Sequence, residues 1–149
     1  MNNIEDNFKS IIDYENIVKK DLGSYAINRP FPHIVIDDFL RKDSLSKIIK
    51  NFPRENDKLK WRMKDFKDKD GTFFQKAKLV AADIFNMNLN ITNLFLELNN
   101  RKFLEFLEFV TRIRGIIPDP YLIGGGIHIY KTGAKLSVHS DFNYHPFFK

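Results

Sequence analysis

The sequence of 149 residues contains no cysteine and only one tryptophan. The lack of cysteine excludes disulfides, thiolate metal sites and a cysteine nucleophile. No stretch approaches the run of roughly 18 apolar residues that a transmembrane helix needs. The first twenty residues also lack the uninterrupted apolar segment of a secretory signal. We therefore expect no membrane span and a cytoplasmic location.

The composition is typical of a single soluble globular domain. Hydrophobic residues make up 43% and charged residues 29% of the chain, which excludes general disorder. The net charge of +5 raises the alternative of nucleic-acid binding. However, the basic residues are interspersed with acidic ones, and the densest stretch, residues 58–69, is interpreted as a solvated loop. We therefore expect no nucleic-acid partner.

Apolar residues recur at helical spacing in the first three quarters of the chain. The pattern predicts amphipathic helices over residues 4–22, 43–52, 91–98 and 103–113. The expected N-caps of the last three helices are Asp43, Asn90 and Asn100. The first helix is expected to end at Gly23 and the last at Gly115.

Strand signals are concentrated near the C-terminal end. Residues 33–37 are short and β-branched, which predicts an entry strand. Residues 73–85 fit either a strand or a short helix, after a turn at Asp70-Gly71. Beyond Pro120 the period changes, and residues 121–130 and 135–142 are predicted to be two strands joined by a turn near Thr132-Gly133. Helices up to about residue 115 followed by strands indicate an α+β fold.

The sharpest chemical pattern is His139-Ser140-Asp141. On a strand, residues i and i+2 point to the same face, so His139 and Asp141 would present an imidazole and a carboxylate side by side. These groups are two of the three ligands in the facial triad that binds non-haem Fe(II) with open coordination positions. The tripeptide alone is a weak signal, because it also occurs by chance.

A hairpin at the predicted turn would extend this candidate site. It would place Gly126 opposite His139, so that His128 and Tyr130 share the face of His139. Tyr130 would then either offer its phenol to an anionic co-substrate or pack its ring as an ordinary strand tyrosine. The spacing leaves both interpretations open, and it makes His128 a candidate residue of the cavity wall.

The segment from Tyr130 to Asp141, YKTGAKLSVHSD, resembles the Y-x-x-G-x-x-x-x-x-H-x-D segment of the prolyl 4-hydroxylase-like Fe(II)/2-oxoglutarate-dependent dioxygenases. Residues 30–40 and 118–128 resemble other parts of that domain. The resemblance implies an N-terminal helical extension over 1–29 and the N-terminal portion of a dioxygenase domain over 30–149. It also implies helices packed on the first strands of a double-stranded β-helix (jelly roll), here incomplete.

The same resemblance implies an activity and its cofactors. The protein would hydroxylate a small-molecule or peptide substrate with Fe(II) and O2 while decarboxylating 2-oxoglutarate to succinate, and ascorbate dependence would accompany this chemistry. His139 and Asp141 would be iron ligands, and Tyr130 would contact 2-oxoglutarate.

The chain departs from the family pattern after Asp141. The family has a second histidine ligand on a later strand, followed by an Arg or Lys that anchors 2-oxoglutarate, and neither is present. We do not expect His33, His145, Arg112 or Arg114 to replace them. The predicted strands are also too few for a jelly roll of about eight strands. We therefore expect a fragment that turns over little by itself, with a non-catalytic jelly-roll binding module or a basic nucleic-acid-binding domain as alternatives.

Overall fold

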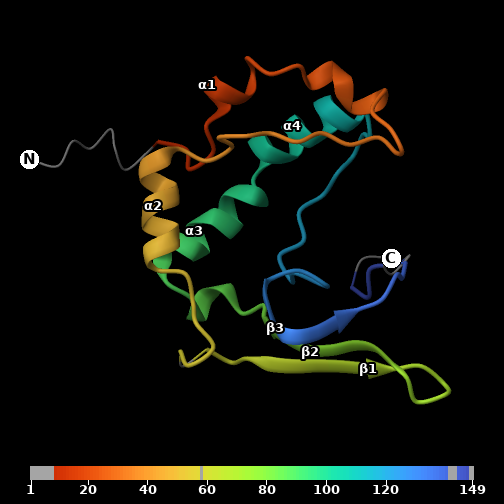
Figure 1. The fold of residues 1–149 in the computed structure, drawn as a ribbon. Helices are drawn as coiled ribbons and strands as arrows, with labels where there is room; N and C mark the ends of the chain where they lie inside the picture. Colours follow the sequence, from red (N-terminus) through yellow and green to blue (C-terminus); the bar gives the residue numbers. More distant parts are fainter. Residues whose placement is uncertain (1–8, 58, 141–143, 148–149) are drawn as a thin grey trace, which may run out of the picture. The chain divides into compact units, whose positions relative to one another are not determined.

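The computed structural model describes residues 9–57, 59–140 and 144–147. The chain forms two compact units, and each unit is built from two separate stretches of sequence. The helical unit comprises Met1–Phe52 and Asn88–Pro120, and the sheet unit comprises Pro53–Met87 and Tyr121–Lys149. The α-helices belong to the helical unit and the β-strands to the sheet unit, so the two kinds of element alternate along the chain (Figure 1).

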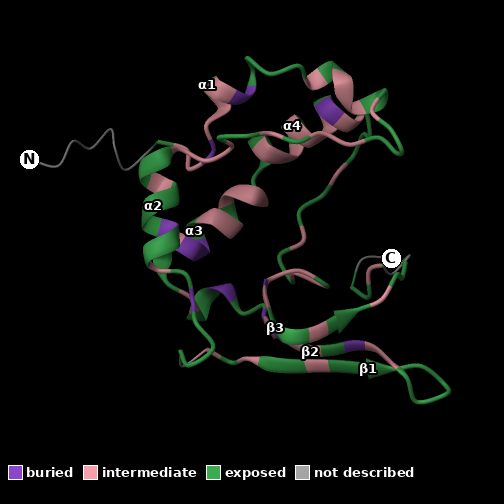
Figure 2. Ribbon diagram, viewed as in Figure 1, coloured by how far each residue is buried: buried purple, intermediate pink, exposed green. Residues whose placement is uncertain are grey.

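The helical unit is built around three helices. Its elements are α1 (Tyr14–Ile17), the 3-10 helix η2 (Leu22–Ala26), α2 (Lys42–Lys50), α3 (Leu89–Leu98) and α4 (Arg101–Thr111). Helix α3 contacts both α2 and α4, and α4 also contacts η2. The buried aliphatic side chains come from nearly every stretch of the unit (Figure 2); they are Ile12, Ile17, Ile48, Ile91 and Val110.

The long first helix predicted over residues 4–22 is wrong for its described part. Helix α1 covers only Tyr14–Ile17, because the chain before it is extended. Ile12 forms an antiparallel bridge with Leu40, and the N–H of Asp13 donates to the carbonyl of Phe39 at 2.9 Å. This pairing across the unit outweighs the local helical periodicity, because it buries the side chain of Ile12 completely.

The other predicted helices are confirmed, with small shifts at their N-termini. Helix α2 begins at Lys42 rather than after Asp43, and the N-cap of α3 is Asn88, whose side chain accepts from the N–H of Asn90 at 3.0 Å. Asn100 caps α4 as predicted, since its Oδ1 accepts from the N–H of Phe103 at 2.9 Å. Helix α4 ends at Thr111, four residues before the predicted glycine stop.

The entry strand predicted over residues 33–37 is absent from the structure. The backbone N–H of His33 donates to the carbonyl of Tyr25 at 3.2 Å, and the carbonyl of His33 accepts from the Asn28 side chain at 2.9 Å. Tyr25 lies in η2 and Asn28 just after it, so the β-branched run has no neighbouring strand with which to pair.

The sheet unit contains a three-stranded antiparallel sheet in the order β1-β2-β3. Its elements are β1 (Arg62–Lys67), β2 (Phe73–Ala81), the 3-10 helix η3 (Ile84–Asn86) and β3 (Ile127–Leu136). The solvated loop predicted over residues 58–69 is therefore wrong, because β1 occupies half of it. Strand β1 is an edge strand, and five of its six residues are exposed. Because most of its side chains face solvent, its sequence lacks the alternation of apolar and polar residues by which a strand is usually predicted.

The hairpin predicted at Thr132-Gly133 is also wrong. Both residues lie inside β3, which runs without a reversal from Ile127 to Leu136. Tyr130 pairs with Lys78 and Lys135 pairs with Lys76, so four residues of β3 face one residue of β2. Gly133, whose φ is +80°, thus lies in a large bulge within the strand instead of in a turn between two strands.

The order of elements corrects the expectation of a mainly helical chain up to about residue 115 followed by strands, since β1 and β2 lie between α2 and α3 in sequence. The coarse α+β expectation of mixed helices and an antiparallel sheet is confirmed. In the part of the chain that the structure describes, no helix has the length and apolar character needed to cross a bilayer.

Candidate functional site

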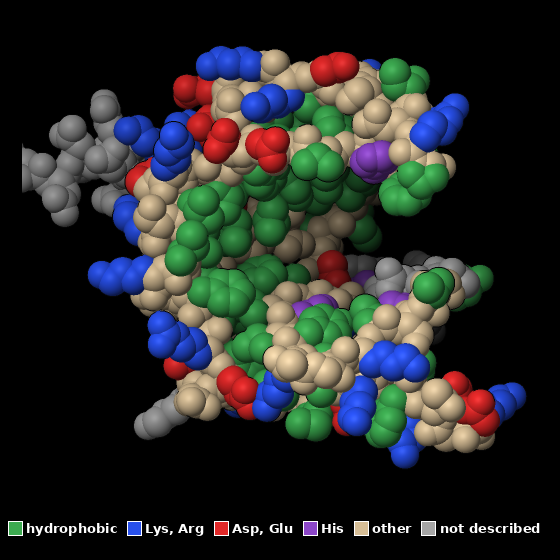
Figure 3. All heavy atoms as spheres, viewed as in Figure 1, with side chains coloured by type: hydrophobic (Ala, Val, Ile, Leu, Met, Phe, Trp, Pro, Cys, Tyr) green, Lys and Arg blue, Asp and Glu red, His purple; other side chains and the backbone are tan. Residues whose placement is uncertain are grey.

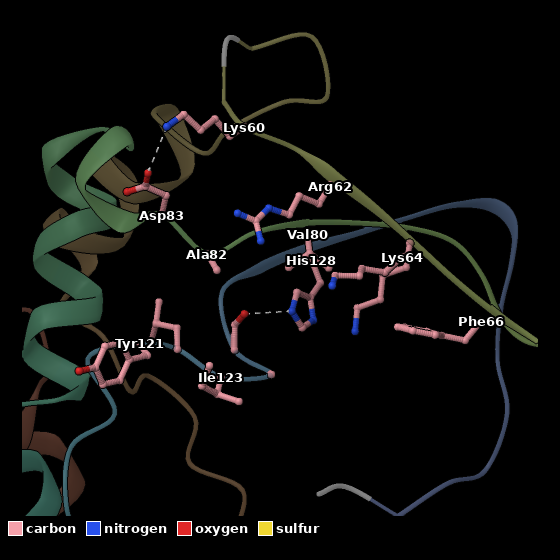
Figure 4. Close-up of a pocket in the computed structure, with 14 residues that line it drawn as sticks. Lys60, Arg62, Lys64, Phe66, Val80, Ala82, Asp83, Tyr121, Ile123 and His128 are labelled. Carbon is pink, nitrogen blue, oxygen red and sulfur yellow. Dashed lines mark hydrogen bonds and ion pairs between the residues drawn. The ribbon is translucent and has the colours of Figure 1, made fainter. Parts of the chain in front are cut away.

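A cavity of about 670 Å³ lies within the sheet unit. One side is the face of the sheet, and another is the loop that leads into β3, residues 121–125 (Figure 4). The lining residues are Lys60, Arg62, Lys64, Phe66, Lys78, Val80, Ala82, Asp83, Tyr121, Leu122, Ile123, Gly124, Gly125 and His128. The volume is within the range of about 300–1,000 Å³ that small-molecule sites occupy.

Strand register explains why basic side chains meet in this cavity. Arg62 pairs with Val80, and Val80 pairs with His128, so these three residues form one row across the sheet. In the neighbouring row Lys64 pairs with Lys78, and Lys78 pairs with Tyr130. Paired residues of an antiparallel sheet project to the same face, so both rows face the same side.

A close backbone approach holds the start of β3 against the end of β2. Gly126 has φ +112°, and a Cβ built there would lie 2.5 Å from the carbonyl oxygen of Ala81. Only glycine fits this position, because any side chain would collide with the neighbouring backbone. Gly126 therefore allows β3 to begin directly after the loop that lines the cavity.

The cavity is strongly electropositive. Of its four Lys and Arg residues, Lys60 has a carboxylate partner, Asp83, with 4.0 Å between Nζ and Oδ2. Among the described residues, no carboxylate forms an ion pair with Arg62, Lys64 or Lys78. Over the outer surface drawn in Figure 3, Lys and Arg are interspersed with Asp and Glu.

His128 lines the electropositive cavity and is half-buried. Burial, followed by the positive charge of Lys78, lowers the pKa of its imidazole, while the carbonyl of Gly125 opposes the shift. His128 Nε2 lies 3.4 Å from that carbonyl oxygen, which can only accept, so Nε2 carries the proton in the neutral ring. In Figure 4 the ring of His128 projects into the cavity, on the same side of the sheet as Arg62 and Lys64.

The other predicted site residues are placed outside the cavity lining. Tyr130 is 41% exposed on β3, and Nζ of Lys78 lies 5.6 Å from the centroid of its ring. His139 is exposed, three residues beyond the end of β3, with its ring 6.4 Å from that of Phe74. Asp141 lies outside the described residues. The geometry that would bring His139 and Asp141 together is therefore not described.

The ring orientation of His139 is compatible with metal binding. Its Nδ1 lies 2.8 Å from the carbonyl oxygen of Ser137, so Nδ1–H donates and the neutral ring has an unprotonated Nε2. A metal-binding histidine usually holds its second nitrogen in this way. His33 in the helical unit has the same arrangement with Phe31, at 2.8 Å, so this feature alone does not identify a ligand.

The described residues contain no cluster of three His, Asp or Glu side chains that could hold a metal ion. His33, Arg112 and Arg114 belong to the helical unit. His145 lies in the sheet unit, with its ring 6.2 Å from that of Tyr121. The complete ligand set of an iron site is thus not assembled from the described side chains.

Sequence reasoning missed the cationic residues of the cavity. Lys60, Arg62 and Lys64 occur at every second position, which is the spacing of one face of a strand. That alternation was the available signal, but the surrounding acidic residues favoured a loop. The position of Lys78 opposite Lys64 depends on strand register, which the sequence alone does not provide.

In comparisons with models of protein families, with curated proteins and with solved structures, nothing matched this chain.

Proposed function

We propose that this chain belongs to an Fe(II)- and 2-oxoglutarate-dependent dioxygenase of the prolyl 4-hydroxylase-like kind, in which the three-stranded sheet is part of a jelly roll. The observation that carries the proposal is the pattern Tyr130…His139-x-Asp141, supported by the 2.8 Å distance from Nδ1 of His139 to the carbonyl oxygen of Ser137. His139 and Asp141 are the proposed iron ligands.

Bound Fe(II) would supply the oxidation chemistry, in which O2 and 2-oxoglutarate are consumed and a substrate is hydroxylated. Ser137 would orient the ligand, because its carbonyl accepts from Nδ1–H of His139 and would leave Nε2 to bind the metal. The carboxylate of Asp141 would add a negative charge that favours the cation.

Tyr130 is the proposed contact of the co-substrate. Its phenol can donate a hydrogen bond to a carboxylate, and the ammonium group of Lys78 lies beside its ring. A dianionic co-substrate at this point of the sheet would therefore meet a donor and a positive charge together. The hydroxylated substrate is proposed to be a small molecule or a peptide.

Metal affinity tests the ligand assignment directly. Under anaerobic conditions, Fe(II) binding to the chain is measured by calorimetry for the wild type, His139→Ala and Asp141→Asn. We expect each variant to weaken binding at least tenfold, since each removes one of the metal's protein ligands. His33→Ala is the matched control, because His33 has the same hydrogen-bonded ring but lies in the other unit.

Equal Fe(II) affinity of His139→Ala, Asp141→Asn and the control would overturn the assignment. Activity gives a second readout, in which succinate release from 2-oxoglutarate is measured with Fe(II) and ascorbate. Any release is expected to disappear in His139→Ala and to decrease in Tyr130→Phe through a higher KM for 2-oxoglutarate.

The electropositive cavity favours a second candidate function, a non-catalytic binding module. Its cations come from β1 and β2 and need no metal to act on a ligand. Ligand binding in the presence of EDTA, combined with no specific Fe(II) binding, would favour this module over the dioxygenase.

A further inference from the structure

We infer that the cavity of the sheet unit binds a small organic anion, in which a phosphate or carboxylate group is joined to an apolar or aromatic part. The inference does not depend on the proposed iron ligand His139 or on Tyr130, because neither lines the cavity, and the two proposals share Lys78 alone.

The first argument is the pairing of two like charges. Lys64 and Lys78 are direct cross-strand partners, and both are half-buried. Like charges opposite one another destabilise a sheet, and burial strengthens their repulsion by lowering the local dielectric. An anion between the two ammonium groups would convert this repulsion into attraction.

The second argument is the concentration of charge that has no carboxylate partner among the described residues. Arg62 lies in the next row of the sheet and lines the same cavity, which brings three cations together. Asp83, which is the one acidic residue among the described residues of the lining, lies against Lys60, as the dashed line in Figure 4 marks. A guanidinium group and two ammonium groups are suited to a doubly charged anion, because they supply charge-assisted hydrogen bonds from several directions.

The third argument comes from the apolar part of the wall. Its side chains belong to β1, to β2 and the residue after it, and to the loop before β3; they are Phe66, Val80, Ala82, Leu122 and Ile123. A free inorganic anion would leave this surface in contact with water. A ligand with an apolar or aromatic part would cover it, and the cavity volume of about 670 Å³ has room for such a molecule.

Calorimetric titration of the full chain in a phosphate-free buffer with EDTA tests the inference. The probes are phenyl phosphate, inorganic phosphate, 2-oxoglutarate and the neutral compound benzyl alcohol. We expect saturable binding of phenyl phosphate that is tighter than binding of inorganic phosphate or benzyl alcohol. Tighter binding of 2-oxoglutarate than of phenyl phosphate would identify the anion as a dicarboxylate, whereas the reverse order would identify a phosphate.

Matched variants locate the binding. Lys64→Gln and Lys78→Gln each remove one cation of the pair, and we expect each to weaken binding of the best anion about tenfold or more. Lys76→Gln is the control, because Lys76 lies on the same strand, is exposed and does not line the cavity. Without ligand, Lys64→Gln is expected to raise the Tm and Lys76→Gln to leave it unchanged.

The inference is overturned if none of the three anions binds, or if Lys76→Gln weakens binding as much as the cavity variants do. A measurement on the wild-type chain keeps the inference testable if the variants fail to fold. The ring signals of His128, followed by NMR during the titration, are expected to shift with the same Kd that calorimetry gives. Unchanged His128 signals at saturation would place the ligand elsewhere and would also overturn the inference.

Discussion

In the helical unit a half-buried carboxylate is met by donors of the chain itself, whereas three cations of the sheet unit, Arg62, Lys64 and Lys78, form no ion pair with a described carboxylate. In the helical unit, the half-buried carboxylate of Glu97 accepts from the hydroxyl of Ser10 and from the N–H groups of Ile11, at 2.7 Å, and Ile12, at 3.2 Å. In the sheet unit, Lys64 and Lys78 face one another. The charge of Glu97 is thus met by protein donors, whereas we infer that the charges of Lys64 and Lys78 are met by a ligand.

The largest expected effect tests the internal network of the helical unit. Glu97→Ala removes the acceptor of three donors near the edge of the core, and we expect a loss of about 3 kcal/mol in the free energy of unfolding, measured in urea. Glu97→Gln keeps one acceptor oxygen and is expected to lose less. Equal stability of Glu97→Ala and the wild type would contradict the structural role of this carboxylate.

The next effect belongs to the sheet unit. Gly126→Ala would force a Cβ to within 2.5 Å of the Ala81 carbonyl oxygen at φ +112°, and we expect a loss of about 2 kcal/mol. Gly133→Ala is the matched control on the same strand, since it has φ +80° but open space around the added Cβ. Its loss is expected to be about 1 kcal/mol, from backbone strain alone. Equal losses would show that β3 does not approach Ala81 so closely.

A smaller effect tests a cap of the helical unit. Asn100→Ala removes the acceptor of the Phe103 N–H at the start of α4, which is expected to cost about 1 kcal/mol. Asn100→Asp keeps an acceptor oxygen at the helix N-terminus and is expected to restore the stability. Failure of Asn100→Asp to recover it, by urea unfolding, would argue against the cap.

A stabilising substitution is expected in β2. Ala77 has φ +58° at the irregularity of the β2–β3 pairing, and its N–H donates to Oδ1 of Asp65 at 2.7 Å. Ala77→Gly relieves the left-handed strain of an alanine and is expected to gain about 0.5 kcal/mol, after the greater entropy of glycine in the unfolded chain is subtracted. A loss of stability in thermal unfolding would contradict this backbone conformation.

The smallest effect at neutral pH concerns Tyr14. Burial and then the charge of Glu97 raise the pKa of Tyr14 to about 12 from its ordinary value of 10.0. The unfolded chain therefore loses this proton first, so stability is full below pH 10 and falls as pH rises from about 10 to 12. In Tyr14→Phe this part of the alkaline loss is expected to vanish in urea unfolding at pH 9 and 11, and an unchanged pH dependence would contradict the shift.

Helix positions could be predicted from the sequence better than strand pairing could. The start of α4 follows from Asn100 and the apolar stripe that comes after it, because caps and periodicity act within a few residues. Strand β1 escaped prediction because it is an exposed edge strand that alternates basic with other residues. The hairpin at Gly133 was wrong because pairing with β2 absorbs the turn residues as a bulge.

In the candidate site, too, some features could be predicted from the sequence and others depend on the tertiary structure. The pattern of Tyr130, His139 and Asp141 is a property of the sequence, and so is the single-sided spacing of Lys60, Arg62 and Lys64. Whether His128 lines a cavity depends on the loop before β3 and on Gly126, which act together only in the folded unit.

The sequence by itself determined the local features of this protein: three amphipathic helices, the asparagine cap of α4 and the absence of any thiol chemistry. Only the tertiary structure decided the register that sets Lys64 opposite Lys78, and the extended pairing of Ile12 with Leu40. The physical reason is the distance along the sequence over which each kind of interaction acts. Caps and helical periodicity depend on neighbours within one or two turns, whereas strand register and charge pairing depend on residues brought together from distant parts of the chain.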